Sequence, residues 1–342
     1  MTANQMLIRL AGFVAAVLAA SSLSAQQPSA GTRNVALNVV ALDSQGNPVE
    51  DLTAADFQVS DQGKPQRIVS FVSNPDPKQL SAPSKPGGPA TGPGTPARPL
   101  VILFDLLNAD FSKRGFGKEE IERALEHMEA SDFLYLYLLT NAGDLYPVHP
   151  IPSRTAEVAP DKTPWTAQIR PMLEDAINKV YGLRPVDESQ MGIRIDSTYK
   201  ALDLIASMIG SIPGPKNIVW ITHGVPTIVR LRGGEPYDYS PQLQRLATAI
   251  DRAGISISVV DQGSDPGSGT LGTLEQLTEL TGGRILTDGV EKAIVNLMTA
   301  ARSSYRIEYA QPSADDKFHK IKVTCTRKGV RLQTKQGYYA YR

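Results

Sequence analysis

Four short apolar runs, separated by segments with helical spacing, constrain the fold of this chain more than any other feature. Three of them, LVILFDL (100–106), FLYLYLL (133–139) and IVWIT (218–222), are nearly unbroken, and the fourth, ISISVVD (255–261), is a strand pattern that includes two serines. A strand that is apolar at nearly every position is buried on both faces, as in a parallel sheet covered by helices. Between the runs, segments such as KEEIERALEHMEA (118–130) place apolar residues on one helical face. We therefore predict an α/β fold over 100–303, with a doubly wound, mostly parallel sheet.

The segments on either side of 100–303 have strand patterns without helical spacing. In 26–73, alternate positions from Val35 are apolar, and DFQVSDQGKPQRIVSF has the pattern of a hairpin. In 304–342, the stretches SSYRIEYA, FHKIKVTCT and GYYAYR also have strand composition. Because a sheet of few strands is marginally stable alone, we expect the C-terminal strands to pack with 34–72 in a small β-rich, sandwich-like region.

A Pro-, Gly- and Ser-rich segment separates the two kinds of pattern. Residues 74–99, NPDPKQLSAPSKPGGPATGPGTPARP, contain almost no bulky apolar side chain. Such a composition does not offset the entropy lost on ordering. We predict a linker and a domain boundary here.

The N-terminus has the composition of a secretory signal. Arg9 precedes the apolar stretch LAGFVAAVLAA (10–20), and the small residues SSLSA follow it. This order of a basic flank, a short apolar core and a small residue before the cut is typical of a cleaved signal peptide. We predict a signal over 1–25, a mature chain from Gln26, and a secreted or periplasmic protein without a transmembrane segment. An uncleaved membrane anchor is the alternative.

Composition and motifs argue against several classes of function. Thirty-five basic residues balance 35 acidic ones, so the net charge of zero does not favour nucleic acid. The single cysteine, Cys325, excludes an intramolecular disulfide and a cysteine-based zinc site. The sequence contains no G-x-S-x-G elbow, no H-E-x-x-H pair, no phosphate loop and no dinucleotide glycine fingerprint.

Three polar residues follow or end the predicted strands. Asp105 ends the first run, His223 follows IVWIT, and Asp261 ends ISISVVD. Ligands of open α/β sheets bind at the carboxyl ends of the strands. We therefore expect these three side chains to share one rim of the sheet.

The order of several motifs resembles one family. VEDLTAADFQVSDQGKPQRIVSF, LVILFDLLNADFS, ALDLIASMIGSIPGPKNIVWIT, LTELTGGRI and FHKIKVTCTRKGVRLQTKQGYYA succeed one another over residues 34–342. In this order they resemble von Willebrand factor A-related proteins of the acidobacterial type. The resemblance implies a von Willebrand factor A-like domain and a function in protein interaction or adhesion.

The family's metal site holds Mg²⁺ with an Asp-x-Ser-x-Ser loop, a threonine and a later aspartate. Asp105 matches the first position, but Leu107 and Ala109 stand where the family has serines. His223 stands where the family has the second aspartate, and Mg²⁺ disfavours a nitrogen ligand. The resemblance therefore implies a degenerate metal site that holds no cofactor, with Mg²⁺ or Mn²⁺ binding disfavoured.

Other residues near this loop leave alternatives open. Thr198 is the candidate for the family's threonine, and Asn108, Asp110 and Ser112 are alternative oxygen ligands if the register shifts. A hydrogen bond from His223 to Asp105, closing the site, is a further reading. The candidate binding residues of the rim are Asp105, Asn108, Thr198, His223 and Asp261.

These features predict a secreted, non-enzymatic protein-interaction or adhesion module whose partner is an unidentified protein or cell surface. One rival is a secreted hydrolase that uses Asp105 and His223 as acid–base partners, although no nucleophile motif accompanies them. Another rival is a structural component of a larger envelope assembly.

Overall fold

The computed structural model describes most of the chain after residue 32. The described residues are 33–73, 99–109, 114–127, 134–151, 165–181, 183, 186, 190–212, 214–229, 235–263, 269–302 and 304–340. The predicted signal (1–25), the predicted linker up to residue 98, and the residues Asp110 and Ser112 lie outside them. Residues 33–342 form one compact unit.

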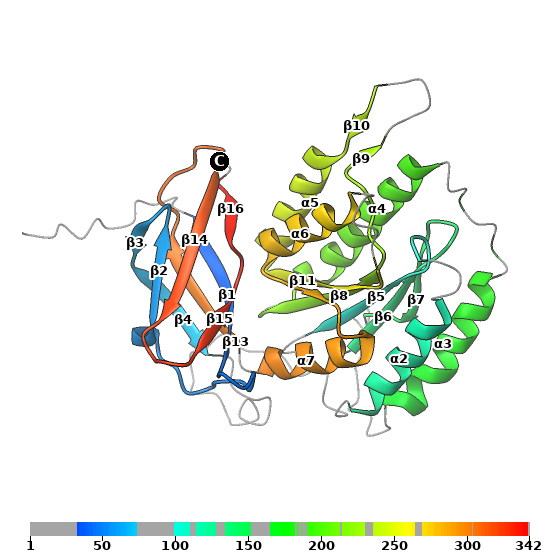
Figure 1. Ribbon diagram of the computed structural model, residues 1–342, viewed down its shortest axis with the longest axis horizontal. Helices are drawn as coiled ribbons and strands as arrows, with labels where there is room; N and C mark the ends of the chain where they lie inside the picture. Colours follow the sequence, from blue (N-terminus) through cyan, green and yellow to red (C-terminus); the bar gives the residue numbers. More distant parts are fainter. Residues whose placement is uncertain are drawn as a thin grey trace, which may run out of the picture. The chain divides into compact units, whose positions relative to one another are not determined.

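A six-stranded sheet carries the candidate rim (Figure 1). Its strands, in spatial order, are β12 (Ile285–Leu286), β11 (Ile255–Asp261), β8 (Lys216–Thr222), β5 (Leu100–Asp105), β6 (Leu134–Leu139) and β7 (Leu145–His149). The first five run parallel, and β7 is antiparallel to β6. Every residue of β5 and β6 is buried, as their unbroken apolar sequence predicts.

Helices cover both faces of this sheet (Figure 1). On one face lie α4 (Met191–Gly210), α5 (Ser240–Arg252) and α6 (Thr270–Thr281), whose apolar side chains share a core with Trp220. On the other lie α2 (Arg114–Glu126), α3 (Trp165–Tyr181) and α7 (Val290–Arg302), which pack with Val219 and Ile221. Successive residues of a strand point to opposite faces, so one apolar run supplies both cores. No helix among the described residues is long and apolar enough to cross a membrane.

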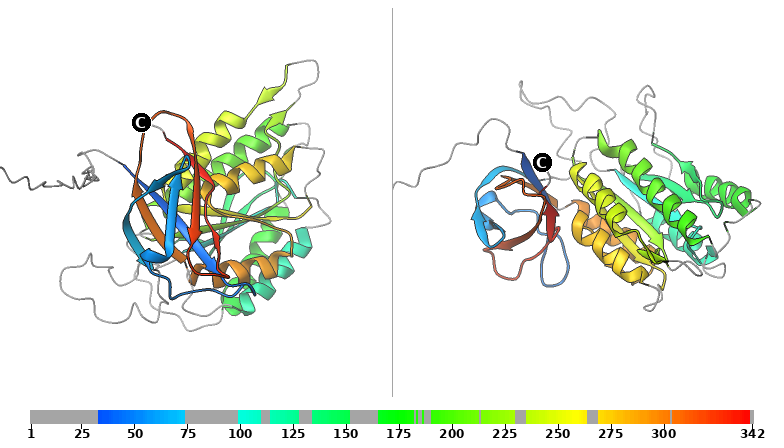
Figure 2. Two further views of the ribbon diagram at one scale, coloured as in Figure 1. Left: turned by 60° about the vertical axis from the view of Figure 1, so that its left-hand side comes forward. Right: turned by 90° about the horizontal axis from the view of Figure 1, so that it is seen from above.

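The segments before and after the six-stranded sheet build two antiparallel sheets (Figure 2). One has the order β15 (Arg331–Gln333), β1 (Asn34–Leu42), β13 (Ser304–Ala310) and β4 (Ile68–Ser73). The other has the order β16 (Gly337–Tyr339), β14 (Phe318–Cys325), β2 (Phe57–Asp61) and β3 (Lys64–Gln66). A short 3₁₀ turn, η1 (Ala54–Asp56), leads into β2. The two sheets share a third core, to which Leu37, Phe57, Tyr305 and Ile321 contribute.

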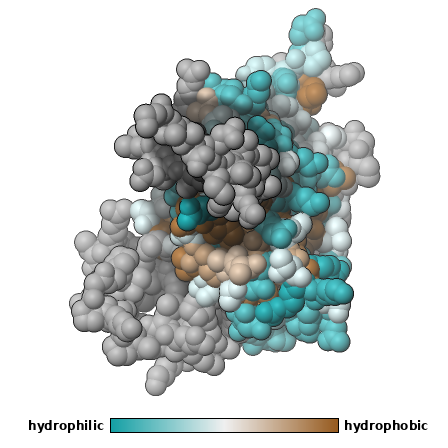
Figure 3. Space-filling view, turned by 90° about the vertical axis from the view of Figure 1, so that its left-hand side faces the viewer, coloured by the Kyte–Doolittle hydropathy of each residue, from teal (hydrophilic) through white to brown (hydrophobic). Residues whose placement is uncertain are grey.

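Apolar side chains remain exposed on the edge strand β4. Val69 and Val72 are 49% and 48% exposed. On the face drawn in Figure 3, hydrophobic residues gather in a band beside hydrophilic ones. Only one side of β4 pairs with a neighbouring strand, β13, among the described residues.

The predicted fold class is wrong. The chain is not built on a single doubly wound, mostly parallel sheet: among the described residues, three of the four sheets are antiparallel, and the six-stranded sheet is mixed. The third antiparallel sheet is the hairpin of β9 (Ile228–Val229) and β10 (Tyr237–Asp238). β7 is antiparallel because a tight turn leads into it from β6, in which the Thr140 N–H donates to the Asp144 carbonyl at 2.8 Å. A turn this short joins only antiparallel strands.

Candidate functional site

Asp105 lies at the carboxyl end of β5, in the middle of the six-stranded sheet. Phe104 is in register with Ile221 of β8, so Asp105 comes level with Thr222. Asp261 ends β11 and is in register with Thr222 on its other side. The carboxyl ends of three neighbouring parallel strands therefore form one rim, at which Asp105 is completely buried.

The Asp105 carboxylate accepts four hydrogen bonds from the chain itself. Oδ2 accepts from the Thr222 hydroxyl at 2.7 Å, from the Asn108 side-chain amide at 2.8 Å and from the Trp220 indole N–H at 3.2 Å. Oδ1 accepts from the Asn108 backbone N–H at 2.9 Å. A carboxylate offers about four lone-pair sites, two on each oxygen, so the three donors at Oδ2 fill that oxygen while Oδ1 accepts one bond. Hydrogen bonds of this kind offset much of the cost of burying a charge.

Asn108 links the rim to helix α4. Its side-chain amide also donates to the Thr198 hydroxyl at 2.9 Å, and that hydroxyl donates to the Arg194 carbonyl at 2.8 Å. The Arg194 guanidinium donates to the Leu107 carbonyl at 2.8 Å. The loop after β5 is thus fastened to the first turns of α4 by side chains that are largely removed from water.

His223 and Asp261 occupy the same rim in other surroundings. His223 follows Thr222 and is half-buried. The next residue, Gly224, has a φ of +76° and donates its N–H to the Thr222 hydroxyl at 2.9 Å. Asp261 is half-buried, and its Oδ1 accepts the Gly263 N–H at 2.9 Å. That bond closes a local turn, a role that Asp side chains often take.

The structure brings three of the five predicted rim residues into one hydrogen-bond network: Asp105, Asn108 and Thr198. Trp220 and Thr222 were not predicted from the sequence, because both lie within an apolar run. The period of two could have found them. Residues 220 and 222 point to the same face of β8, so a threonine at this strand end lies where its hydroxyl can donate to Asp105.

The geometry gives a metal ion few ligands at this rim. Leu107 and Ala109 are buried, with 4% and 6% exposure, and both oxygens of Asp105 face protein donors. Within the part of the chain that the structure describes, no group of three or more His, Cys, Asp or Glu side chains could hold a metal ion. Asp110 and Ser112, the candidates for rescue, lie outside that part. Absence of a cofactor stays a prediction.

A second buried carboxylate, Asp61, lies between the two antiparallel sheets. Its Oδ2 accepts from the hydroxyls of Tyr309 and Tyr338, both at 2.9 Å, and its Oδ1 lies 2.7 Å from His319 Nδ1. The other ring nitrogen of His319 lies 3.1 Å from Asp315 Oδ1. Burial raises the pKa of both tyrosine hydroxyls, and the carboxylate of Asp61 raises them further. Sequence analysis did not single out this network, whose members are up to 277 residues apart.

Comparison of the sequence with models of protein families and with curated proteins yields no match. The resemblance to von Willebrand factor A-related proteins therefore rests on the motifs alone and stays a prediction.

Proposed function

We propose that this chain is a secreted, non-enzymatic protein-interaction module of the von Willebrand factor A-related type, and that the rim binds its partner. The observation that carries the proposal is a set of large apolar side chains exposed around the rim. They are Ile193 (50% exposed), Ile228 (57%), Tyr237 (49%) and Leu271 (36%). Exposed apolar and aromatic side chains grouped at one site are typical of surfaces that bind proteins.

Each of these side chains belongs to an element that borders the rim. Ile193 lies in the first turn of α4, beside Arg194, which is bonded to the loop after β5. Ile228 begins β9, a few residues after His223. Leu271 lies in the first turn of α6, next to Thr270. Thr270 packs closely against Gly224, the residue after His223, since a Cβ added at Gly224 would lie only 3.2 Å from Thr270 Cβ.

Tyr237 has the properties of an interface anchor. Its ring packs edge-on against Tyr239, with centroids 4.6 Å apart and an interplanar angle of 61°. Its hydroxyl accepts a hydrogen bond from Gln242 Nε2 at 3.0 Å. The side chain is therefore ordered before binding, which lowers the entropic cost of an interface. Full burial of a large apolar side chain contributes about 1.5–3 kcal/mol, and Tyr237, which is 49% exposed, would gain about half of this on binding.

The surroundings of Asp105 favour binding over catalysis. A general acid or base must reach a substrate, whereas the Asp105 side chain is fully buried and accepts four hydrogen bonds. The hydrolase that uses Asp105 with His223 is thus the weaker proposal. The envelope-assembly alternative differs from ours in the number of partners, and co-purification with envelope fractions of the native host separates the two.

A capture experiment tests the rim. Tagged mature chain (26–342) is incubated with envelope extract of the native host, beside the double variant Ile228→Ser/Tyr237→Ser. The matched control is Leu204→Ser on α4, a side chain that is 43% exposed. We expect a partner that is retained by the wild type and the control but lost from the double variant. Equal capture by all three proteins, or by none, would refute the rim as the binding surface.

Export has its own test. Mass spectrometry of protein isolated from the native host should show a mature N-terminus near Gln26. An intact Met1 in the cytosolic fraction would overturn secretion and leave the rim proposal untouched.

A further inference from the structure

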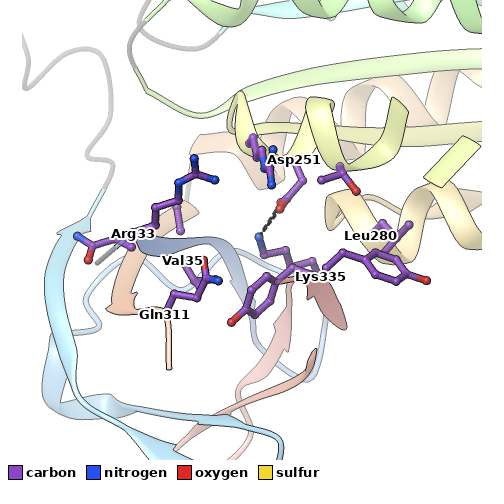
Figure 4. Close-up of a pocket in the computed structure, with 12 residues that line it drawn as sticks. Arg33, Val35, Asp251, Leu280, Gln311 and Lys335 are labelled. Carbon is purple, nitrogen blue, oxygen red and sulfur yellow. Dashed lines mark hydrogen bonds and ion pairs between the residues drawn. The ribbon is translucent and has the colours of Figure 1, made fainter. Parts of the chain in front are cut away.

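A cavity of about 420 Å³, drawn in Figure 4, lies at the amino ends of the parallel strands, opposite the rim. Its walls come from the start of β1, the last turns of α5 and the strand β16, with Leu280 of α6. Asp251, which lines the cavity, lies in the last turn of α5, just before the first residue of β11, whereas the rim residue Asp261 is the last residue of that strand. The cavity and the rim therefore lie at opposite ends of β11. The volume falls within the range of about 300–1,000 Å³ that small-molecule sites occupy.

The cavity has an excess of positive charge. Arg33, Arg252 and Lys335 line it, and the acidic side chain among the lining residues is Asp251. Lys335 Nζ lies 2.6 Å and 2.7 Å from the two oxygens of Asp251, and Figure 4 shows this pair in the wall. The pair is largely buried, and burial raises the pKa of the Asp251 carboxyl although Lys335 opposes the shift. Lys335 and Arg252 both act on the Asp251 carboxylate, and with Arg33 the lining has three basic side chains against one acidic one, so a ligand meets a net positive charge.

The cavity continues along the exposed face of α5. A neighbouring depression is lined by Pro241, Gln244 and Arg245, and shares Thr248 and Arg252 with the cavity. These positions recur at helical spacing on one face of α5, whereas Leu243, Leu246, Ala247 and Ile250 face the core. From Pro241 to Arg252 the helix rises by about 16 Å, at about 1.5 Å per residue.

We propose that this groove, defined by the lining residues of the cavity and of the depression, binds an extended acidic peptide segment of a partner protein. An extended chain covers about 3.3–3.6 Å per residue, so about five residues span the groove. Arg245 and Arg252 lie along it and Arg33 stands at the cavity, where guanidinium groups can bind carboxylates with paired hydrogen bonds. The proposal rests on this edge of the sheet and does not depend on the function proposed for the rim.

Binding of labelled pentaglutamate to the mature chain (26–342), measured by fluorescence anisotropy at low salt, tests the groove. Pentaglutamine of equal length is the uncharged control peptide. The test variant is Arg33→Gln/Arg252→Gln, both exposed in the structure. The charge-matched control is Arg67→Gln/Arg331→Gln, two exposed arginines that do not line the groove.

We expect pentaglutamate to bind and pentaglutamine not to, with affinity at least tenfold weaker in the test variant and changed less than twofold in the control. If Arg33→Gln/Arg252→Gln does not fold, Arg245→Gln gives a second measurement, with an expected loss of about threefold. Two results would overturn the proposal. One is no binding of pentaglutamate at 1 mM, and the other is an equal loss in the test and control variants, which indicates attraction by overall charge.

Discussion

Replacing Thr222 by valine tests whether the chain's own donors hold the buried carboxylate of Asp105. The Thr222 hydroxyl is fully buried, donates to Asp105 Oδ2 at 2.7 Å and accepts the Gly224 N–H at 2.9 Å. Valine keeps the branched shape and the strand preference of threonine, so the substitution removes the hydroxyl and little else. A hydrogen bond to a charged group contributes about 1.5–3 kcal/mol, and a neutral one about 1 kcal/mol. We expect the free energy of unfolding to fall by about 2–4 kcal/mol.

Urea unfolding of the mature chain measures this change. With an m-value of about 3 kcal/mol per molar urea, the expected loss lowers the midpoint by roughly 1 M while m stays constant. The matched control is Thr299→Val, because the Thr299 hydroxyl is exposed and donates within its own helix to the Val295 carbonyl at 2.9 Å. A surface change of this kind stays within about 0.5 kcal/mol.

A midpoint for Thr222→Val equal to that of Thr299→Val would refute the reasoning. It would mean that the bond to Asp105 contributes no net stability. The Asp105 carboxylate would then not be a structural group that its protein donors stabilise. A changed m-value would instead show that the variant alters the unfolding transition, and hydrogen exchange of β8 would then replace the midpoint as the readout.

Three further predictions follow from the buried residues. Burial lowers the pKa of Lys216 from 10.5 to about 8, so between these two pH values the unfolded chain binds more protons than the folded chain. The free energy of unfolding should therefore rise as the pH increases from 8 to 10.5. Urea titrations should show this rise in the wild type and not in Lys216→Met. Combining Leu107→Ser, Ala109→Ser and His223→Asp should permit Mg²⁺ binding by calorimetry, which the wild type should show only in the millimolar range or weaker. The same variant should lose about 2–5 kcal/mol of stability by urea unfolding, since Leu107 is a core side chain. A chain of 100–342 lacks the strands that flank β13, so hydrogen exchange should show β13 unprotected.

The periodicity of the sequence predicted individual strands well, because buried strand positions are occupied by apolar residues and exposed ones by polar residues. The alternation from Val35 is confirmed by β1, whose inward positions are buried and whose outward positions are not. The unbroken apolar runs are confirmed by β5 and β6, which are buried at every residue. In each case the signal is local, since each residue reports its own exposure.

The sequence pattern predicted that the C-terminal strands pack with 34–72, but not which strands pair or in which register. β1 pairs with β13, so that Asn34 is opposite Ala310, and β2 pairs with β14. An alternating strand has the same pattern whichever partner it pairs with, and no turn between these segments fixes a register. The fold class was wrong because the apolar runs identify buried strands, while the number and direction of their neighbours depend on the connections between strands, such as the tight turn that makes β7 antiparallel.

The candidate site shows the same division. Asp105 was found because an acidic residue at the end of a buried strand is conspicuous. Its partner Thr222 was not predicted, because threonine is β-branched and common in strands, so its presence in an apolar run does not indicate a site. The buried pair of Asp61 and His319 joins residues 258 positions apart, and nothing near either residue indicates the other. Polar networks that cross the fold are therefore the part of a site that sequence patterns describe least.

The two edges of the six-stranded sheet differ in chemistry, and this difference makes the two proposals separable. At the carboxyl edge, Asp105 is closed in by protein donors and the surrounding elements expose apolar side chains such as Tyr237. At the amino edge, arginines such as Arg252 surround a buried ion pair. The seven residues of β11 hold these edges about 20 Å apart, at about 3.3 Å per residue. Contacts at one edge therefore do not overlap those at the other, so Ile228→Ser/Tyr237→Ser should leave the affinity for pentaglutamate unchanged. A parallel loss of both activities would mean instead that one partner spans the sheet, or that the rim substitutions disturb the fold as far as α5.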